Sequence, residues 1–425
     1  MPTFAGIMEN RKKVIIAGGG FAGIQLARHL DPRRFEVLLL DRLNHHQFQP
    51  LFYQVATSQL EPSGISFPLR YIFRRYKNVR IRMTSVGSVN PGAGQLHTAI
   101  GDFDYDYLVL ATGCSTNFFG NEEIARHAFT LKSTTDAIAL RNHMLQTFER
   151  IISAGPAERK ALMNVVIVGA GPTGVELAGA FAEIKKHILP KDYPDIDFTQ
   201  FQILLVEGSP YTLQVMSEAS RRESKKYLDR MGVKIYTNTL VEKYDGHIAR
   251  LSNGEEVSTA TLIWAAGVTG NLVGGLPPEA QAPGRRLKVD RTCLVQGTRN
   301  VYAVGDLAYM ETPKYPKGHP QVANVAIHQA RLLASNLKRR EQGLAGLPFE
   351  YKDLGSMATI GRNKAVVDLP YLHLKGYPAW FIWMSLHLML ILSVKNKLII
   401  FIQWTWAYIT KNTSLRLILK RKEDI

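Results

Sequence analysis

The stretch VIIAGGGFAGIQLARHL at residues 14–30 places a short apolar strand pattern, a glycine-rich turn and a helical pattern in direct succession. Gly18, Gly20 and Gly23 in this stretch follow the spacing GxGxxG. In this arrangement the backbone N–H groups of the turn lie at the N-terminus of the following helix, where they stabilise a pyrophosphate. The stretch therefore predicts one strand–turn–helix unit of a dinucleotide-binding fold.

The same order of patterns returns in VVIVGAGPTGVELAGAFAEI at residues 165–184, with Gly169, Gly171 and Gly174 at the same spacing. A single GxGxxG is a weak signal, because glycine turns also join strands to helices where nothing binds. Two copies, each between a strand pattern and a helix pattern, are a strong signal. The chain is therefore expected to bind two dinucleotides, one a resident redox group and the other a diffusing nicotinamide.

An acidic residue ends the strand pattern that follows each glycine turn. FEVLLL at residues 35–40 runs into Asp41, and ILLVE at residues 203–207 ends in Glu207. A carboxylate at this place accepts hydrogen bonds from the adenosine ribose of a dinucleotide. Glu207 also favours NADH over NADPH, because the 2′-phosphate of NADPH would meet a negative charge.

Three further strand-to-loop segments complete the pattern of a flavoprotein. YLVLATG at residues 107–113 and LIWAAG at residues 262–267 each stand at the far end of one unit. VYAVGDLA at residues 301–308 places Asp306 where a carboxylate bonds the ribityl or pyrophosphate part of a flavin. This order is similar to that of the pyridine nucleotide disulfide reductase-like flavoproteins. It implies that FAD binds the first unit, which the late GD segment completes.

The two cysteines, Cys114 and Cys293, are far apart and form no CxxC motif. This spacing predicts neither a disulfide framework nor a metal site. Disulfide-reductase chemistry requires two redox cysteines against the flavin. Cys114 follows the ATG segment, but Cys293 lies in the strand-like TCLVQG and offers no partner by spacing. Dithiol chemistry is therefore not expected, and the acceptor is expected to take electrons directly from the flavin.

The composition is that of a folded protein with a strong positive charge. Hydrophobic residues make up 46% of the 425 residues and charged residues 21%, which excludes a disordered or fibrous chain. The formal net charge of +16 favours an anionic partner: nucleic acid, an acidic lipid surface or a phosphate-rich ligand. No nucleic-acid module accompanies the charge, so lipid is preferred. The opening MPTFAGIMENRKK lacks the apolar core of a secretory signal, which favours a location in or facing the bacterial cytoplasm.

The stretch NHHQFQPLFYQVATSQLEPSGISFPLR at residues 44–70 resembles the signature after the first nucleotide unit in type II NADH dehydrogenases. These are the single-chain, non-proton-pumping NADH:quinone oxidoreductases. The resemblance continues in order through ATG (111–113), GAGPTGVELAG (169–179), VEGSP (206–210), WAAGV (264–268), VYAVGDLA (301–308), PQVANVAIHQA (320–330) and DLGSMATIGRNKAVVDL (353–369). It implies hydride transfer from NADH to non-covalent FAD, followed by electron transfer to a membrane quinone.

The resemblance also assigns residues to the two nucleotides. Toward FAD it implies the first glycine turn and Asp41, together with Val86, Thr112, Gly113, Asp306, Ala323, Asn324 and Lys364. Toward NADH it implies the second glycine turn and Glu207. No residue is assigned to a metal.

Glu176 follows Gly174 by two residues, in what the pattern predicts as the first turn of the second nucleotide helix. One interpretation is an acid favoured by the helix dipole, a contribution of roughly 0.3 to 1 kcal/mol. The family resemblance implies a second role, near the nicotinamide and the flavin edge. A buried carboxylate there would have a raised pKa and would relay a proton, which makes Glu176 the candidate catalytic residue.

The quinone motif of the family, AQxAxQ, corresponds here to ANVAIH at residues 323–328, with Gln329 next. Asn324 replaces one motif glutamine and keeps the amide chemistry with a shorter reach. His328 replaces the other and titrates near neutral pH. The implied quinone contacts are therefore Asn324, His328 and Gln329, although a hydrogen-bonded helix histidine is an equally good interpretation of His328. The type of quinone stays open.

Residues 378–409 are rich in Trp, Phe, Leu and Ile, but Lys395, Asn396 and Lys397 interrupt them. The apolar run before this break, 379–394, is shorter than the roughly 20 residues that a spanning helix needs. Two helices in the membrane interface fit better. The residues expected at the lipid headgroups are Trp380, Trp383, Trp404, Trp406, Lys411, Arg416, Lys420, Arg421 and Lys422. The alternative is a helical pair packed on the body or on a second subunit.

The expected fold is α/β, with two Rossmann-like dinucleotide-binding domains, for FAD and NAD, and a C-terminal helical membrane-associating segment. The expected bounds are 1–116 and 275–350 for the FAD domain, 117–274 for the NAD(H) domain and 351–425 for the C-terminal region. A homodimer on the cytoplasmic face of the bacterial inner membrane is expected. Two other classes share the nucleotide units: a soluble ferredoxin or rubredoxin reductase, and an FAD-carrying redox-sensing protein.

Overall fold

The computed structural model describes residues 11–412 and 415–418, so the expectations for residues 1–10 and for Lys420, Arg421 and Lys422 lie outside the described residues. The chain forms two compact units. Unit 1 comprises the described residues up to His46 together with Phe67–Ser115 and Val268–Lys352. Unit 2 comprises Gln47–Ser66, Thr116–Gly267 and the described residues from Asp353 onward.

Both units are discontinuous in the chain. Gln47–Ser66, which lies within the signature stretch, belongs to unit 2, although the residues on either side of it belong to unit 1. The C-terminal region from Asp353 also belongs to unit 2. The domain bounds expected from the sequence, and the nucleotide that each unit binds, stay predictions.

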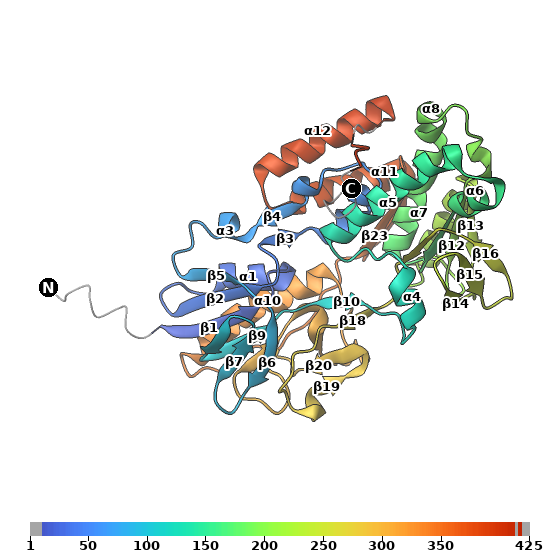
Figure 1. Ribbon diagram of the computed structural model, residues 1–425. Helices are drawn as coiled ribbons and strands as arrows, with labels where there is room; N and C mark the ends of the chain where they lie inside the picture. Colours follow the sequence, from blue (N-terminus) through green and yellow to red (C-terminus); the bar gives the residue numbers. More distant parts are fainter. Residues whose placement is uncertain (1–10, 413–414, 419–425) are drawn as a thin grey trace. The chain divides into compact units, whose positions relative to one another are not determined.

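Unit 1 is built on a five-stranded parallel sheet with the order β21-β9-β1-β2-β5. Strands β9, β1, β2 and β5 of this sheet are labelled in Figure 1. Its strands are Val301–Ala303 (β21), Tyr107–Leu110 (β9), Lys12–Ala17 (β1), Phe35–Asp41 (β2) and Val79–Met83 (β5). β1 pairs on both sides, with Ala17 opposite Leu40 and Leu110. Its Val and Ile side chains are fully buried, as expected of a central parallel strand. The strands expected at residues 14–17 and 35–40 are confirmed.

Two helices pack together on this sheet. Helix α1 (Phe21–His29) lies against β1 and β2, and α10 (Ala323–Arg340) lies beside α1 (Figure 1). Two small sheets, which the sequence did not predict, complete unit 1. Their strands are β6 (Val86–Asn90), β7 (Gln95–Thr98) and β8 (Gly101–Asp104), and β19 (Gln281–Ala282), β20 (Arg286–Lys288) and β22 (Ala308–Tyr309). Short elements are β3 (His45–Gln47), β4 (Ser66–Pro68), α3 (Leu69–Ile72), β10 (Cys114–Thr116) and β18 (Val268–Gly270).

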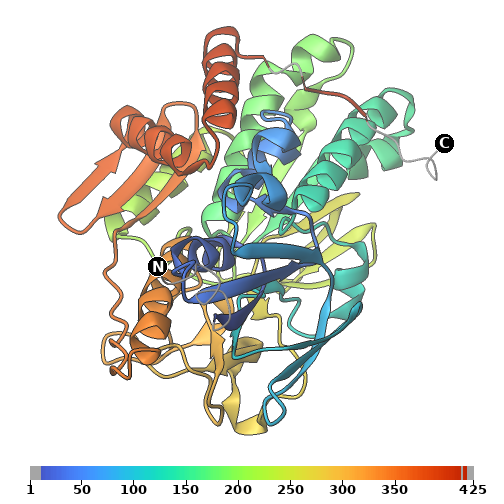
Figure 2. The ribbon, with the colours of Figure 1, turned by 90° about the vertical axis from the view of Figure 1, so that its left-hand side faces the viewer.

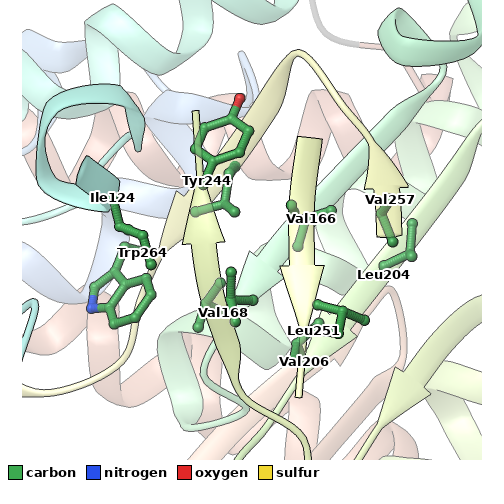
Figure 3. Close-up of a cluster of buried hydrophobic side chains, with 12 residues drawn as sticks. Ile124, Val166, Val168, Leu204, Val206, Tyr244, Leu251, Val257 and Trp264 are labelled. Carbon is green, nitrogen blue, oxygen red and sulfur yellow. The ribbon is translucent and has the colours of Figure 1, made fainter. Parts of the chain in front are cut away.

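Unit 2 contains a second parallel sheet with the order β13-β12-β11-β17. Its strands are Val233–Tyr236 (β13), Gln202–Val206 (β12), Asn164–Val168 (β11) and Thr261–Trp264 (β17). An antiparallel sheet of Val241–Tyr244 (β14), Ile248–Leu251 (β15) and Glu256–Ser258 (β16) contributes side chains to the same hydrophobic cluster (Figure 3). Trp264, at the end of β17, is part of this cluster and donates its indole N–H to the Asn117 carbonyl at 2.9 Å.

Before the C-terminal region, the longest helices of unit 2 are α5 and α7, and the short helix α2 contacts both. The helices are α2 (Phe52–Ala56), α4 (Glu122–His127), α5 (Thr134–Ser153), α6 (Pro156–Leu162), α7 (Pro172–His187), α8 (Leu189–Asp192) and α9 (Glu218–Arg230). α7 follows the second glycine turn, as the sequence predicts, and begins with a proline at its first position. Gly179 lets another strand cross α7 closely, since a Cβ there would lie 1.9 Å from the Ile360 carbonyl oxygen.

That strand belongs to a C-terminal antiparallel sheet that the sequence did not predict. The sheet consists of β23 (Ser356–Gly361), β24 (Lys364–Leu369) and β25 (Leu372–Lys375). Helix α11 (Gly376–Leu390) packs against all three strands, and α12 (Val394–Thr410) follows (Figure 2). Within the described part of the chain, no helix has the length and apolar character needed to cross a membrane.

The expected break between the two C-terminal helices was placed wrongly. The helices separate at residues 391–393, and Lys395, Asn396 and Lys397 lie inside the first turn of α12. Two of these polar side chains have hydrogen-bond partners, and Lys397 donates its Nζ to the Met389 carbonyl at 2.9 Å. Asn396 donates to the carbonyls of Ser63 and Gly64, both at 2.9 Å. Hydropathy alone does not reveal such contacts.

Candidate functional site

The first glycine turn contains two kinds of glycine. Gly18 has φ +116°, and a Cβ there would lie 2.2 Å from the Ala111 carbonyl oxygen. A Cβ on Gly23 would lie 1.8 Å from the Gly18 carbonyl oxygen, so the fold itself requires both glycines. Gly20 differs, because its φ of −76° and ψ of −164° suit any residue and a Cβ would meet nothing within 4 Å. Its missing side chain leaves the N-terminus of α1 open, as a pyrophosphate requires.

The second glycine turn, in unit 2, repeats this division. Gly169 has φ +99° and lies against Ala266, and a Cβ on Gly174 would lie 1.8 Å from the Gly169 carbonyl oxygen. Gly171, with φ −70° and ψ −176°, again has open space where its Cβ would stand. In each unit, therefore, the middle glycine of the turn is not required by the fold. Its missing side chain leaves the N-terminus of the following helix open. This is the arrangement that an anionic ligand uses.

A carboxylate at the end of a strand holds each turn in place. Asp41 Oδ2 accepts a hydrogen bond from the Gly19 N–H at 2.5 Å, and Glu207 Oε2 accepts one from the Ala170 N–H at 2.6 Å. In both cases the other carboxylate oxygen accepts from the backbone N–H two residues further along. The acidic residues that the sequence placed at the two ribose positions thus lie directly beside the glycine turns.

His46 also supports the first turn, which the sequence analysis missed. Its Nδ1 donates to the Gly19 carbonyl at 3.2 Å. Burial lowers the pKa of His46 to about 4, so the ring is neutral at neutral pH. The signature stretch contains two adjacent histidines, which could have pointed to this role. A single sequence, however, does not tell a buried histidine that bonds the turn from a histidine on the surface.

The other residues assigned to FAD lie on several elements. Thr112 donates its hydroxyl to the Asn271 carbonyl at 2.8 Å, and Cys114 donates its thiol to Asp306 Oδ2 at 3.0 Å. Val86 begins β6, and Ala323 and Asn324 begin α10. These residues all belong to unit 1, as does Gly113, which has φ +66°. Lys364 belongs to unit 2, on β24, where its Nζ lies 3.9 Å from Glu183 Oε1.

The two remaining quinone candidates lie on α10. Gln329 is completely buried, and its Oε1 accepts from the Gly305 N–H at 2.8 Å. Its Nε2 makes no hydrogen bond to a described residue. His328 is half-buried, and burial, followed by the charge of Arg331, lowers its pKa. Gln329 therefore holds the loop that carries Asp306, a role that the sequence did not indicate.

Cys293 does not lie in a strand, contrary to the sequence-based expectation. It has φ +71° in a turn, is fully buried, and burial strongly raises the pKa of its thiol. Within the described residues no cluster of His, Cys, Asp and Glu has the arrangement of a metal site. Cys114 and Cys293 form no disulfide bond.

Unit 2 contains a cavity of about 150 Å³ lined by parts of α2, α7, β23, α11 and α12, which we call the tryptophan-lined cavity. Its walls include Tyr53, Gln54, Glu176, Thr359, Trp380, Trp383 and Trp404. Trp383 and Trp404, expected at lipid headgroups, are thus buried wall residues instead. Arg416 was also expected at the lipid headgroups. Its guanidinium instead forms an ion pair with Asp192, with Nε and Oδ2 2.6 Å apart.

Glu176 is buried in the wall of this cavity, with 8% of its surface exposed. It is the fifth residue of α7, so the expectation that it lies in the first turn is wrong and the helix-dipole interpretation loses its basis. Burial raises the pKa of Glu176 to about 8, although the nearby N–H groups of Thr359 and Trp383 favour its charged form. The carboxyl group is therefore largely protonated at neutral pH.

Comparisons with known proteins identify the family. The model of the pyridine nucleotide-disulphide oxidoreductases matches residues 12–330, and that of the NDH2 C-terminal domain matches residues 354–416. The chain is 34% identical to the type II NADH:quinone oxidoreductase Ndh of Mycobacterium tuberculosis, over 94% of this chain and 89% of that protein. The chain belongs to the type II NADH:quinone oxidoreductases.

More distant relatives extend the similarity. An internal alternative NAD(P)H-ubiquinone oxidoreductase of Arabidopsis thaliana mitochondria is 27% identical, over 94% of this chain and 84% of that protein. The fold matches the solved structure of NDH2 from Plasmodium falciparum in complex with NADH, with a TM-score of 0.88 and 23% identity. That match covers 97% of this chain and 100% of the other. The expected α/β flavoprotein fold with parallel sheets and C-terminal helices is confirmed.

Proposed function

We propose that this chain oxidises NADH, holds FAD without a covalent bond and reduces a membrane quinone. As a type II NADH:quinone oxidoreductase it is of the non-proton-pumping kind. The observation that carries the proposal is the 34% identity to the mycobacterial enzyme, which runs through both nucleotide units and the C-terminal region. Bound FAD would accept a hydride from NADH and pass the two electrons on to quinone.

The residues of unit 1 fit the FAD. The open N-terminus of α1 at Gly20 would take the pyrophosphate, and Asp41 would take the ribose. The other FAD contacts proposed within unit 1 are Gly18, Gly23, Val86, Thr112, Gly113, Asp306, Ala323 and Asn324. Lys364, on β24 of unit 2, stays a prediction from the family resemblance. Since Asp41 already accepts a hydrogen bond from the Gly19 N–H, it would hold the turn and the ribose together.

The second turn fits NADH in the same way. Gly169, Gly171 and Gly174 would present the N-terminus of α7 to the pyrophosphate, and Glu207 would bind the ribose hydroxyls. A fixed negative charge at this place disfavours the 2′-phosphate of NADPH. NADH is therefore the proposed donor.

Glu176 is the proposed acid–base residue. With a pKa raised to about 8 by burial, its carboxyl group holds a proton at neutral pH and can release it to a reduced acceptor. Asn324 and His328 remain proposed quinone contacts on α10. Gln329 would act through the loop that it holds, because its side chain is fully buried.

The C-terminal helices are the proposed membrane contact. Several large apolar side chains of α12 are exposed, among them Phe401, Ile402, Trp406 and Ile409. Lys411 follows them, and the net charge of +16 favours an anionic lipid surface. We place the enzyme on the cytoplasmic face of the bacterial inner membrane as a peripheral homodimer.

Steady-state kinetics with alternative acceptors test the function. The purified enzyme should oxidise NADH rapidly with a short-chain quinone and slowly with a ferredoxin. A ferredoxin reductase from Rhodopseudomonas palustris shares the fold, with a TM-score of 0.65, but the match to the NDH2 C-terminal model favours the quinone. Turnover with ferredoxin and none with quinone would reverse this choice, and an absence of NADH oxidation with either would favour a redox sensor.

A further inference from the structure

A hydrogen-bond chain connects α12 to the wall of the tryptophan-lined cavity. Trp404 donates its indole N–H to Gln54 Oε1 at 2.7 Å. Gln54 Nε2 lies 2.8 Å from the hydroxyl oxygen of its neighbour Tyr53. All three side chains are buried, although Trp404 and Gln54 are 350 positions apart in the chain. The chain of bonds therefore ties the C-terminal region to the signature stretch.

The chemistry of the three groups fixes the direction of every bond. An indole nitrogen only donates, so the Gln54 atom that faces Trp404 must be the amide oxygen. The amide NH₂ then faces Tyr53, and because it has no acceptor capacity the Tyr53 oxygen must accept from it. The proton of the Tyr53 hydroxyl is consequently left for another acceptor. No described residue accepts that proton in a hydrogen bond.

The Tyr53 hydroxyl lies in the wall of the same cavity as Glu176. Burial, and then the charge of Glu176, raise the pKa of Tyr53 well above its ordinary value, so the hydroxyl remains a donor. A second donor without a partner is close by. Trp383 is almost fully buried, and its ring contacts that of Tyr53 with centroids 6.4 Å apart. Its Nε1 is near enough to Glu176 to favour the charged carboxylate, but it is not within hydrogen-bonding distance of any described residue.

Two unpartnered donors in one apolar cavity select a ligand with an acceptor atom. Buried donors are almost always paired in folded proteins, and leaving them unpaired is costly. Protonated Glu176 adds a third donor to the same wall. A carbonyl oxygen on a flat apolar ring matches this wall, whereas a cation does not.

We propose that Tyr53 and Trp383 donate hydrogen bonds to a carbonyl oxygen of the electron acceptor, and that Trp404, acting through Gln54, is the positioning residue that directs the Tyr53 hydroxyl into the cavity. The proposal rests on quinone being the acceptor. It makes α12 part of the acceptor site in addition to its proposed membrane contact.

The first test is Trp404→Phe, which keeps an aromatic ring, removes the indole donor and also removes some ring volume. Gln54 is then free to turn its amide over, so the Tyr53 hydroxyl loses its fixed direction. We expect the KM for a short-chain quinone to rise roughly five- to tenfold, as for one lost hydrogen bond, and kcat to change less. The rate of NADH oxidation with ferricyanide as acceptor, and the FAD content, should stay close to those of the unmodified enzyme.

Trp264→Phe is the matched control. It removes an indole N–H bond to a backbone oxygen of similar length, from an equally buried tryptophan, in the hydrophobic cluster of Figure 3. It should lower thermal stability by a similar amount and leave the KM for quinone unchanged. If Trp404→Phe and Trp264→Phe had the same effect on quinone KM, the positioning role would be wrong.

A double-mutant cycle separates positioning from a second, independent contact. Tyr53→Phe should raise the quinone KM by a similar factor, and adding Trp404→Phe should bring no further increase, because Trp404 acts only through Tyr53. Effects that multiply would contradict the proposal.

Gln54→Glu provides a second variant, because a carboxylate at this position would accept hydrogen bonds from both Trp404 and Tyr53 and so turn the Tyr53 hydroxyl away from the cavity. Its quinone KM should also rise, and an unchanged value would contradict the chain of bonds.

Direct binding separates this inference from the proposed function. Isothermal titration calorimetry of the oxidised holoenzyme with the short-chain quinone should give a Kd that rises in Trp404→Phe by the same factor as the KM. If the unmodified enzyme binds quinone in this Trp404-dependent way and does not turn over, the proposed function fails and the site stands. If quinone turns over normally and its Kd is indifferent to Tyr53 and Trp404, the site fails and the function stands.

Discussion

Gly20 and Gly171 share an extended backbone conformation that any residue can adopt, with open space where a side chain would stand. Gly20→Ala should therefore leave folding intact and still weaken FAD retention, because the methyl group would stand where we propose that the pyrophosphate binds. Gly171→Ala should keep FAD and raise the KM for NADH on the order of tenfold, or about 1.4 kcal/mol.

Gly155→Ala is the control for this pair, since its Cβ is equally free and it lies at the N-cap of α6, outside both turns. It should change neither property. Flavin absorbance after gel filtration, together with steady-state kinetics, measures both effects. If Gly20→Ala kept its full FAD content, the pyrophosphate would bind elsewhere.

The raised pKa of Glu176 has a consequence for stability. Above its ordinary value of 4.5 the unfolded chain releases this proton, whereas the folded protein retains it until about pH 8. The unfolded state then binds fewer protons, so the contribution of Glu176 to stability falls as the pH rises between these values. Glu176→Gln resembles the protonated acid and should remove this part of the decline.

Thermal unfolding at about pH 5 and about pH 8 measures the effect. The unmodified protein should lose more of its Tm over this interval than Glu176→Gln does, by roughly several °C. Parallel curves for the two proteins would show that the carboxylate is already ionised in the folded state.

The proposed role of Glu207 at the ribose is tested by the preference of the enzyme for NADH over NADPH. Glu207→Gln keeps an oxygen acceptor for the Ala170 N–H and removes the charge that repels a 2′-phosphate. The ratio of kcat/KM for NADH to that for NADPH should fall on the order of tenfold. A natural preference for NADPH in the unmodified enzyme would mean that this carboxylate does not face the ribose.

Local sequence was enough to place some of these residues and not others. Asp41 and Glu207 follow strands that pair in parallel beside a glycine turn, so a local pattern determines their place. Tyr53, Gln54 and Trp404 meet only through tertiary packing, and no spacing in the sequence records that contact. For Glu176 the family resemblance implied a buried carboxylate, but the helix begins at Pro172, earlier than expected, so Glu176 lies beyond the first turn.

Among the elements, the strands and helices around the two glycine turns were predictable because each short apolar run leads directly into a glycine turn and then into a helical pattern. β23, β24 and β25 were missed, since their sequence was read only as a family motif. The close approach of β23 to α7 depends on the contact between Ile360 and Gly179. These two residues are 181 positions apart, so no local pattern reveals the contact. The helix break before α12 was misplaced because charged residues were taken as a stop, although Asn396 has partners on another segment.

The exposed face of α12 gives a prediction of its own. Ile402 and Ile409 are 63% and 72% exposed. Replacing both with Glu should weaken binding to vesicles of anionic phospholipid at least roughly tenfold, because apolar burial is lost and like charges are added. FAD content and turnover with a short-chain quinone should persist.

Val215→Glu, at a position 83% exposed and outside α12, controls for the added charge in a sedimentation assay. It should reduce vesicle binding only slightly. If the α12 variant still bound vesicles and instead changed its oligomeric state, this face would be a subunit interface.

The molecule as a whole repeats one nucleotide-binding design within two units, each interrupted by segments of the other along the chain. The repetition was visible in the sequence, because both copies keep strand, glycine turn, helix and terminal acid. The allocation of Gln47–Ser66 and of the C-terminal region to unit 2 was not visible, because it depends on long-range packing.

Anaerobic rapid mixing tests the central claim most directly. NADH added to the purified enzyme should bleach the visible absorbance of a bound flavin, and a short-chain quinone added next should restore it within the turnover time. The account requires both steps in one protein with no other component. Bleaching by NADH that quinone does not reverse, or a folded protein without flavin absorbance, would contradict it.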